Sequence, residues 1–353
     1  MSSRRPCGTF DTNYSKDICI LRTPFHWIMF LVLLAGFLIV FPIFAGEGFL
    51  AIMNLISITI IATLGINFLT GYCGQISLGH AIFVAVGGYI TGICMNHLGF
   101  SWWATLPFSA AGTALIGLFF GLPSLRLKGF YIAMSTLASY FILVWILMHG
   151  GSVTGGINGL PVDVPMIGSH EISSQLQFFY LIAGFLILAV FVAKSIARGR
   201  LGRVFIAIRD DDLAAEVMGI NVFGYKLIAF AICSAYAGIA GSLFATYWGF
   251  ITYEQFPFTD NVWYLGYVII GGMGSIVGSI FGVFFLKLLG YFVMFSGPAL
   301  GTLIPGIAGS VVSSMLLIFN GVVIVSFLIL EPRGLHHRWE TVRASMQIWP
   351  FTY

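Results

Sequence analysis

The chain has 353 residues, of which 59% are hydrophobic and only 8% are charged. A soluble globular domain carries about 25% charged residues, so a water-soluble fold is excluded because it could not cover this much apolar surface. The net charge of +3 comes without a basic patch interleaved with aromatic residues, which argues against a nucleic-acid-binding protein.

The apolar segments follow a polar N-terminal stretch, residues 1–26, which we interpret as cytoplasmic. The first apolar run, about 27–45, is too long for a signal-peptide core and predicts an uncleaved helix. A helix needs about 20 apolar residues to cross the hydrocarbon core. Further candidate spans lie near 49–70, 78–97, 102–121, 130–148, 177–197, 226–249, 262–277, 278–297 and 304–330.

These runs are apolar on all sides, whereas the strands of a membrane barrel would be short and alternating. We therefore expect an all-α, polytopic integral membrane protein with about ten transmembrane helices. Glycines interrupt the run at 78–97 and the pair at 262–277 and 278–297. They favour broken or re-entrant pieces at these places.

The positions of the charges support an even number of spans. With both termini in the cytoplasm, all but one of the 16 Lys and Arg residues fall on the inner side or at inner helix ends. This is the asymmetry of the positive-inside rule. The exception is Lys287, inside a predicted span, and the predicted outer loops instead hold Glu47, Asp163, Glu171, Glu254 and Asp260.

Two polar segments interrupt the apolar pattern, a glycine-rich outer loop at about 149–176 and a charged inner segment at about 198–225. Val204–Ile220 in the inner segment is predicted to form one short helix. Three aspartates near its start favour the helix dipole: Asp210, Asp211 and Asp212. An apolar face follows, made of Leu213, Val217 and Ile220, and the expected stop residues are Gly219 and Asn221. The helix is either an interfacial surface helix or a docking element for a cytoplasmic partner.

Motifs of enzymes and nucleotide-binding proteins are missing from the sequence. No GxxxxGK[ST] P-loop occurs, so an ATP-driven engine would have to be another polypeptide. We find no catalytic constellation, no metal site and no cofactor site, and expect the chain not to be an enzyme. The cysteines have no metal-ligand spacing and are interpreted as free thiols: Cys7, Cys19, Cys73, Cys94 and Cys233.

Several passages, taken in order, match one known family. They are Thr70–His80 (TGYCGQISLGH) with Gly87–Tyr89, Leu125–Leu137 (LRLKGFYIAMSTL), Thr154–Leu160 (TGGINGL), Gly202–Arg203 with Ala207–Asn221 (AIRDDDLAAEVMGIN) and Lys226–Phe230, Gly271–Gly278 (GGMGSIVG) and Glu331–Leu335 (EPRGL). Their order and spacing resemble the M-type permease of the branched-chain amino acid (LIV-type) ATP-binding cassette (ABC) importers. The resemblance covers roughly residues 50–335.

The resemblance implies a ten-helix permease of the vitamin-B12/ribose importer type over residues 27–335, with 336–353 as a cytoplasmic tail. It implies four kinds of partner in a bacterial inner membrane: a second homologous permease, two P-loop ATPase subunits, a periplasmic solute-binding protein and membrane lipid. ATP and Mg²⁺ would be bound by the ATPases. In that family the segment at 207–222 couples to the ATPases. The matching residues are Arg209, Asp212, Ala214, Ala215 and Gly219.

Polar residues inside the predicted spans are candidates for the translocation path, because such side chains usually face the bundle. They are Asn54, Asn67, Gln75, Ser77 and His80. The glycines around Gln75 indicate either an unwound stretch exposed to a solute or close helix packing. His80 is either a path residue or a histidine bonded within the core.

Two further features have alternative interpretations. Lys287 either functions within the membrane or snorkels to an interface or pairs with a carbonyl. Thr154 and Asn158 in the outer loop either contact the binding protein or belong to a mobile loop.

The predicted function is the permease subunit of an ABC importer that forms, with a second permease, the path for branched-chain or related amino acids. The alternative is an ion-coupled secondary transporter of a small polar solute. That alternative would more often need a carboxylate near the middle of a span, and we find none there.

Overall fold

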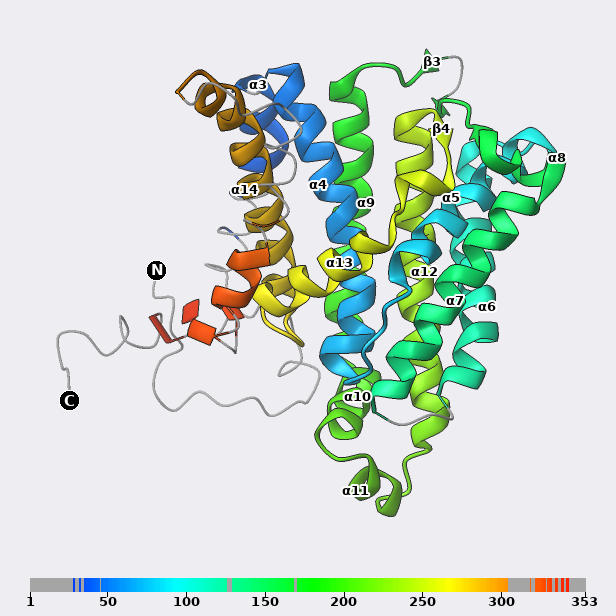
Figure 1. The fold of residues 1–353 in the computed structure, drawn as a ribbon, viewed down its shortest axis with the longest axis vertical. Helices are drawn as coiled ribbons and strands as arrows, with labels where there is room; N and C mark the ends of the chain where they lie inside the picture. Colours follow the sequence, from blue (N-terminus) through cyan, green and yellow to red (C-terminus); the bar gives the residue numbers. More distant parts are fainter. Residues whose placement is uncertain are drawn as a thin grey trace.

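The computed structural model describes residues 35–44, 46–125, 129–167 and 170–303, with residues 28 and 32 and short pieces between 318 and 342. The predicted N-terminal segment, and most of the first and last predicted spans and of the C-terminal tail, lie outside the described residues. The described chain is a bundle of long α-helices (Figure 1). The expected all-α membrane class is confirmed.

Six helices among the described residues are long and apolar enough to cross a membrane. They are α4 (Glu47–Ile66) continued by the π-helix η2 (Asn67–Tyr72), α6 (Trp102–Ser124), α7 (Phe130–His149), α9 (Gln175–Arg198), α12 (Val222–Trp248) and α14 (Ile276–Leu303). Each coincides to within a few residues at its start with a predicted span. The total of about ten remains a prediction.

The core of the bundle lies around α4 and α12. In the apolar stretch of α4–η2, 78% of the residues are buried, against 33% in α6 and in α9. Helix α12 packs against α4, α5 (His80–Asn96) and α6. Ser109 of α6 joins this packing because its Oγ lies 2.7 Å from the Gly87 carbonyl oxygen and 2.9 Å from that of Gly238. Hydroxyls commonly link helices in this way inside membranes.

The interruption expected around 272–278 is present, whereas the predicted span at 78–97 is not broken: it forms the continuous helix α5, and the non-helical stretch precedes it. Residues 73–79 are not helical, and α5 begins at His80, whose imidazole Nε2 lies 2.9 Å from the Ala62 carbonyl oxygen, midway along α4–η2. Helix α13 (Phe258–Gly271) has 14 residues and is about 21 Å long, too short to cross the hydrocarbon core. A turn at 272–275 reverses the chain into α14.

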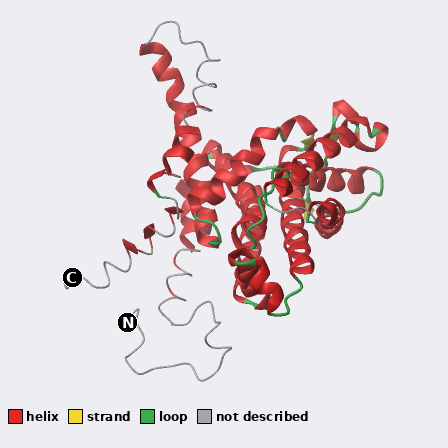
Figure 2. Cartoon of the chain, turned by 60° about the horizontal axis from the view of Figure 1, so that its bottom comes forward, coloured by secondary structure: helices red, strands yellow, loops and turns green. Residues whose placement is uncertain are grey.

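Short elements mark the two ends of the bundle (Figures 1 and 2). At one end lie α8 (Gly151–Thr154), η3 (Gly156–Asn158) and the antiparallel pairs β1 (Leu160–Pro161) with β4 (Phe250–Ile251) and β2 (Met166–Ile167) with β3 (His170–Glu171). The strands are followed by η4 (Tyr253–Gln255), and η1 (Gly36–Val40) with α3 (Phe41–Phe44) precedes α4. We call this the β3 end. The opposite α11 end carries α10 (Arg200–Asp210) and α11 (Asp212–Val217).

Candidate coupling and translocation sites

The inner charged segment is two helices, so the prediction of one helix over Val204–Ile220 was wrong. The chain breaks at Asp211, which is extended (φ −159°, ψ 110°). Its Oδ1 accepts hydrogen bonds from the backbone N–H groups of Leu213 (2.9 Å) and Ala214 (3.1 Å). An aspartate in this geometry is a helix N-cap, and capping α11 offsets the hydrogen bonds lost at the break.

Gly219 ends the α11 segment, as the sequence predicted. Its backbone is left-handed (φ +83°), and its N–H donates to the Glu216 carbonyl oxygen at 2.9 Å. Nothing lies within 4 Å of a Cβ built at this position, so the requirement for glycine is conformational and not one of space. Asn221 is not a second stop residue. Its Oδ1 accepts from Gly224 N–H at 3.0 Å and caps the start of α12.

Helix α11 presents apolar side chains outward. Leu213 is 66% exposed, Val217 87% and the following Met218 82%, whereas Ala215 is buried against the bundle. Asp212 forms an ion pair with the largely buried Lys226 of α12, which fixes α11 to the next helix. An exposed apolar surface on a helix that is anchored to the bundle is typical of a surface that contacts a partner.

Arg209 connects this segment to the end of the α4–η2 span. Its guanidinium Nη1 donates to the Gly71 carbonyl oxygen at 3.1 Å, while Nε and Nη2 donate to Asp210 Oδ1 at 3.1 and 3.0 Å. Arg209 thus forms a direct contact between α10 and the backbone of η2. This contact could not be predicted from local sequence, because Gly71 and Arg209 are 138 residues apart.

Asn67 lies one helical turn from Gly71, and both its carboxamide nitrogen and its carboxamide oxygen form hydrogen bonds with the turn between α13 and α14. Its Nδ2 donates to the Ser275 carbonyl oxygen at 3.1 Å, and its Oδ1 accepts from Gly274 N–H at 3.0 Å. A Cβ on Gly71 would lie 2.4 Å from the Gly274 nitrogen, so only glycine permits the approach. We call Asn67, Gly71, Arg209, Gly274 and Ser275 the glycine junction.

His80 is enclosed by protein. It is fully buried, with Nε2 on the Ala62 carbonyl oxygen, Nδ1 3.3 Å from Cys233 Sγ, and the Tyr264 ring 4.9 Å away in an edge-on arrangement. This is the geometry of a histidine bonded within the core, one of the two interpretations left open by the sequence.

The unwound residues 73–79 are held by neighbouring helices. Leu78 N–H donates to Thr136 Oγ1 of α7 at 3.0 Å, and Ala81 N–H to Asn261 Oδ1 of α13 at 2.8 Å. Ser77 is buried, and its Oγ lies 3.4 Å from Gly79 N–H. Gln75 differs because its side-chain Oε1 is buried and finds no hydrogen-bond partner within the described residues.

Asn54 lies near the opposite end of the same span. Its Nδ2 is 3.3 Å from the backbone oxygen of Gln175 and 3.4 Å from Gln175 Oε1, which also accepts from Tyr247 O–H at 2.8 Å. This polar trio joins α4, α9 and α12. Asn54 is fully buried, yet its Oδ1 has no partner in the part of the chain that is described. Gln175 and Tyr247 were not among the predicted site residues.

The contacts thus separate the five candidate path residues. Asn67 belongs to the glycine junction, whereas Gln75, Ser77 and His80 belong to the unwound segment and its helix start. Asn54 belongs to the polar trio and is 13 residues from Asn67, about 20 Å along the helix.

Lys287 has an acidic neighbour that the sequence did not predict. We expected Asp260 in an outer loop, but it is the third residue of α13 and is partly buried. Helices α13 and α14 pack together, so Asp260 and Lys287 lie on neighbouring helices. The helix begins at Phe258, directly after Pro257, which takes the extended N-cap position.

The two residues predicted to contact the binding protein, Thr154 and Asn158, differ in their exposure. Thr154 is buried, and its Oγ1 donates to the Leu147 carbonyl oxygen at 2.8 Å and accepts from Gly156 N–H at 3.3 Å. It therefore holds the loop together, whereas Asn158 is exposed on the surface of the β3 end.

The cysteines that the structure describes, Cys73, Cys94 and Cys233, are buried free thiols. Burial raises the pKa of the Cys73 thiol, at the α11 end, to about 12. Cys7 and Cys19 lie outside the described residues. Within the described ranges no three His, Cys, Asp or Glu side chains come together as a metal site would require.

Comparison with known proteins adds independent findings. The profile of the family described as branched-chain amino acid transport system / permease component matches residues 48–330. The chain is 33% identical over 271 residues to the high-affinity branched-chain amino acid transport system permease protein LivM of Escherichia coli (strain K12), and 32% identical to LivM of Salmonella typhimurium. Each alignment covers 70% of this chain and 64% of the relative.

A more distant relative is the permease of a different import system. The autoinducer 2 import system permease protein LsrC of Escherichia coli O9:H4 is 29% identical over 268 residues, which are 70% of this chain and 74% of LsrC. The chain thus spans less than two thirds of the length of the LivM relatives. No solved structure gives a significant match.

Proposed function

Because the chain belongs to the family of branched-chain amino acid transport system permease components, we propose that it is the membrane-spanning permease subunit of an ABC importer. The observation that carries this proposal is the α10–α11 element. It offers an exposed apolar tip at one end of the bundle and is tied by Arg209 to the end of a central span. This is what a subunit needs if force generated outside the membrane is to move helices inside it.

The α11 end would face the cytoplasm and the β3 end the periplasm of a bacterial inner membrane. Arg198, Arg200, Arg203 and Arg209 gather around α10, while Glu47, Asp163 and Glu171 belong to the other end. This distribution agrees with the positive-inside rule. Both chain termini would then be cytoplasmic if the span number is ten.

One of two P-loop ATPase subunits would dock on Leu213, Val217 and Met218 of this chain, and the two ATPases would bind the ATP and Mg²⁺ that this chain lacks the motif to bind. A second homologous permease would complete the path, and a periplasmic binding protein would deliver the solute to the β3 end. There the exposed Asn158 is the candidate contact, with Thr154 shaping the loop beneath it.

The solute would be a branched-chain or related amino acid. Of the five candidate path residues, Asn54 and Gln75 each keep a buried carbonyl oxygen without a partner among the described residues. An α-ammonium group could donate to either oxygen. Asn67, Ser77 and His80 are instead occupied by protein contacts and would shape the path without touching the solute.

The test is assembly and coupled transport. This chain would be co-expressed with its candidate second permease and ATPases, purified through a tag on this chain, and reconstituted with the binding protein. We expect ATP-dependent leucine uptake and co-purification of the ATPases. Uptake by this chain alone, driven by an ion gradient, would contradict the importer assignment.

A matched pair of variants tests the docking surface. Leu213 and Ile157 are 66% and 67% exposed but lie at opposite ends of the bundle. We expect Leu213→Asp to lose the ATPase subunits from the purified complex and Ile157→Asp to keep them. Equal retention by both variants would show that α11 is only an interfacial helix.

A further inference from the structure

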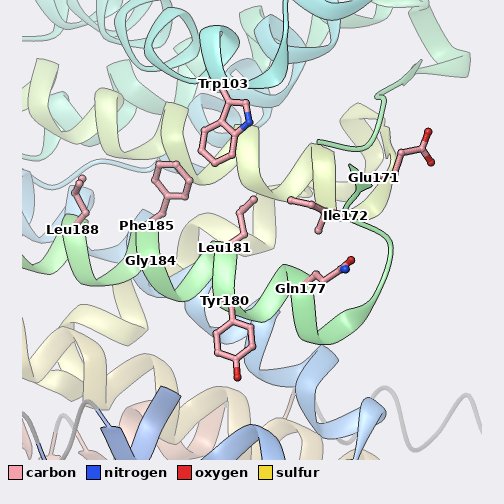
Figure 3. Close-up of a pocket in the computed structure, with 9 residues that line it drawn as sticks. All are labelled: Trp103, Glu171, Ile172, Gln177, Tyr180, Leu181, Gly184, Phe185 and Leu188. Atoms are coloured by element: carbon pink, nitrogen blue, oxygen red, sulfur yellow. The ribbon is translucent and has the colours of Figure 1, made fainter. Parts of the chain in front are cut away.

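A groove of about 840 Å³ runs along the outside of α9 at the β3 end, and its lining includes no residue of the junction or the polar trio (Figure 3). Its floor is a single helical stripe with spacings of three and four residues. The stripe consists of Gln177, Tyr180, Leu181, Gly184, Phe185 and Leu188. The opposite face of α9, including Phe179 and Ile182, is buried in the bundle, so the groove faces outward.

The groove has the depth of one leaflet. From Gln177 to Leu188 is 11 residues, about 16 Å along the helix, and half of the hydrocarbon core is about 15 Å. Gly184 keeps the middle open, because nothing lies within 4 Å of a Cβ built there. A linear chain of methylene groups fits this long, narrow shape. A helix packed on this face would not require a groove.

The far wall is an aromatic side chain held in place. Trp103 of α6 donates from Nε1 to the Met166 carbonyl oxygen at 3.0 Å, and its ring centroid is 6.4 Å from that of Phe185. Figure 3 shows Trp103 standing over Phe185 and Leu181. Tryptophans are enriched at the membrane–water boundary, which places the polar end of the groove at headgroup level.

Glu171 and Gln177 both lie toward that end of the groove, on either side of Ile172, and Leu188 lies at the other extreme (Figure 3). Gln177 Oε1 accepts from the backbone N–H groups of Ser173 (3.1 Å) and Ser174 (3.3 Å). The carboxamide is therefore fixed, and its Nε2 donor has no partner within the described residues. The carboxylate of Glu171 is exposed and makes no salt bridge among the same residues.

We propose that this groove binds one phospholipid with an ammonium headgroup, of the phosphatidylethanolamine class. Glu171 binds the ammonium, Gln177 Nε2 donates to a phosphate oxygen, and an acyl chain lies along Leu181, Phe185 and Leu188 beneath Trp103. The acidic residue selects against an anionic headgroup such as phosphatidylglycerol. This binding requires only that the helices span a bilayer, and it is independent of the transported solute.

Native mass spectrometry of the purified chain tests the site. The detergent-solubilised protein would be equilibrated with equal amounts of phosphatidylethanolamine and phosphatidylglycerol. We expect one retained phosphatidylethanolamine per chain and no preference in Glu171→Gln. Equal retention of both lipids by the unmodified protein would overturn the proposal.

Two leucine variants separate the groove from general lipid contact. Gly184→Leu fills the groove and should lose the retained lipid. Gly290→Leu, at a glycine of α14 that also has nothing within 4 Å of a Cβ, should keep it. Equal lipid retention by the two variants would contradict the proposal.

The competing occupant is a second protein chain on this face. In membranes, Leu188→Cys should not form a disulfide-linked dimer and should be labelled by a lipid-soluble thiol reagent. Efficient disulfide formation would mean that protein covers the groove, and the lipid assignment would fail.

Discussion

The glycine junction and the polar trio lie on the same central span but use equally buried asparagines in opposite ways. Asn67 and Asn54 are 1% and 0% exposed. Asn67 satisfies both ends of its carboxamide on one backbone turn, whereas Asn54 leaves Oδ1 unpartnered within the described residues. A buried acceptor without a partner costs about 1–3 kcal/mol of stability.

Whether a buried polar side chain has all its hydrogen-bond partners within the protein therefore distinguishes a structural residue from a candidate for solute contact. The junction joins three elements far apart in sequence and connects them to the docking helix pair. The trio leaves the Asn54 Oδ1 acceptor without a partner among the described residues, and we propose that a solute binds it. Variants at the positions of both regions test this difference.

Gly71→Leu should produce the largest loss. A leucine side chain there would overlap the backbone nitrogen of Gly274 and Oδ1 of Asn67. The Gly274 backbone cannot move aside as the end of a flexible side chain would. Overpacking at such a site costs about 3 kcal/mol or more. Thermal unfolding in detergent should show a lower melting temperature and little monodisperse protein. Gly48→Leu, at an open glycine in the first turn of α4, is the control and should be close to the unmodified protein.

Exchanging the two asparagines for alanine tests the comparison directly. Asn67→Ala leaves Gly274 N–H and the Ser275 carbonyl without their partner and should cost about 2–4 kcal/mol of stability. Asn54→Ala should cost less than about 1 kcal/mol, yet reduce leucine uptake about tenfold if a solute hydrogen bond is lost. Melting temperatures and uptake rates measured on both variants decide the matter. Equal loss of stability in the two variants would remove the distinction.

Arg209→Ala should disconnect the docking segment from the junction while leaving the fold intact. In the reconstituted complex we expect ATP hydrolysis to continue and solute moved per ATP to fall about fivefold, as expected for a coupling free energy of about 1 kcal/mol. Arg200→Ala, at an exposed position of the same helix, is the control and should transport normally. Unchanged coupling in Arg209→Ala would mean that the Gly71 contact is only structural.

An effect of similar size is expected at Gly219, where only the backbone conformation is demanding. Gly219→Val places a β-branched residue at φ +83° and should weaken ATPase retention by about 1–2 kcal/mol. Gly219→Asn should be tolerated, because asparagine adopts left-handed geometry more readily. If both variants retain the ATPases equally, the exit from α11 does not depend on a left-handed residue.

Much of the fold was predictable because the signals are local. Apolar runs of membrane length predicted α4, α6, α7, α9 and α12 with starts within four residues of those observed. The glycines of Thr70–His80 and Gly271–Gly278 marked the two places where helices are interrupted. The charged inner segment was correctly identified as helical, although Asp211 was interpreted as part of a first turn and is instead a cap between two helices.

Residue types and their spacing along the chain are enough to show which segments are long and apolar enough to cross a membrane and which family the chain belongs to. Only the tertiary structure decided which buried polar residues are occupied. Asn67 and its partner Ser275 are 208 residues apart, and no periodicity links them. The same holds for Arg209 with Gly71 and for Asn54 with Gln175. A polar side chain in lipid must find a partner, but which backbone group comes within 3 Å is set by the packing of helices that the local sequence does not encode.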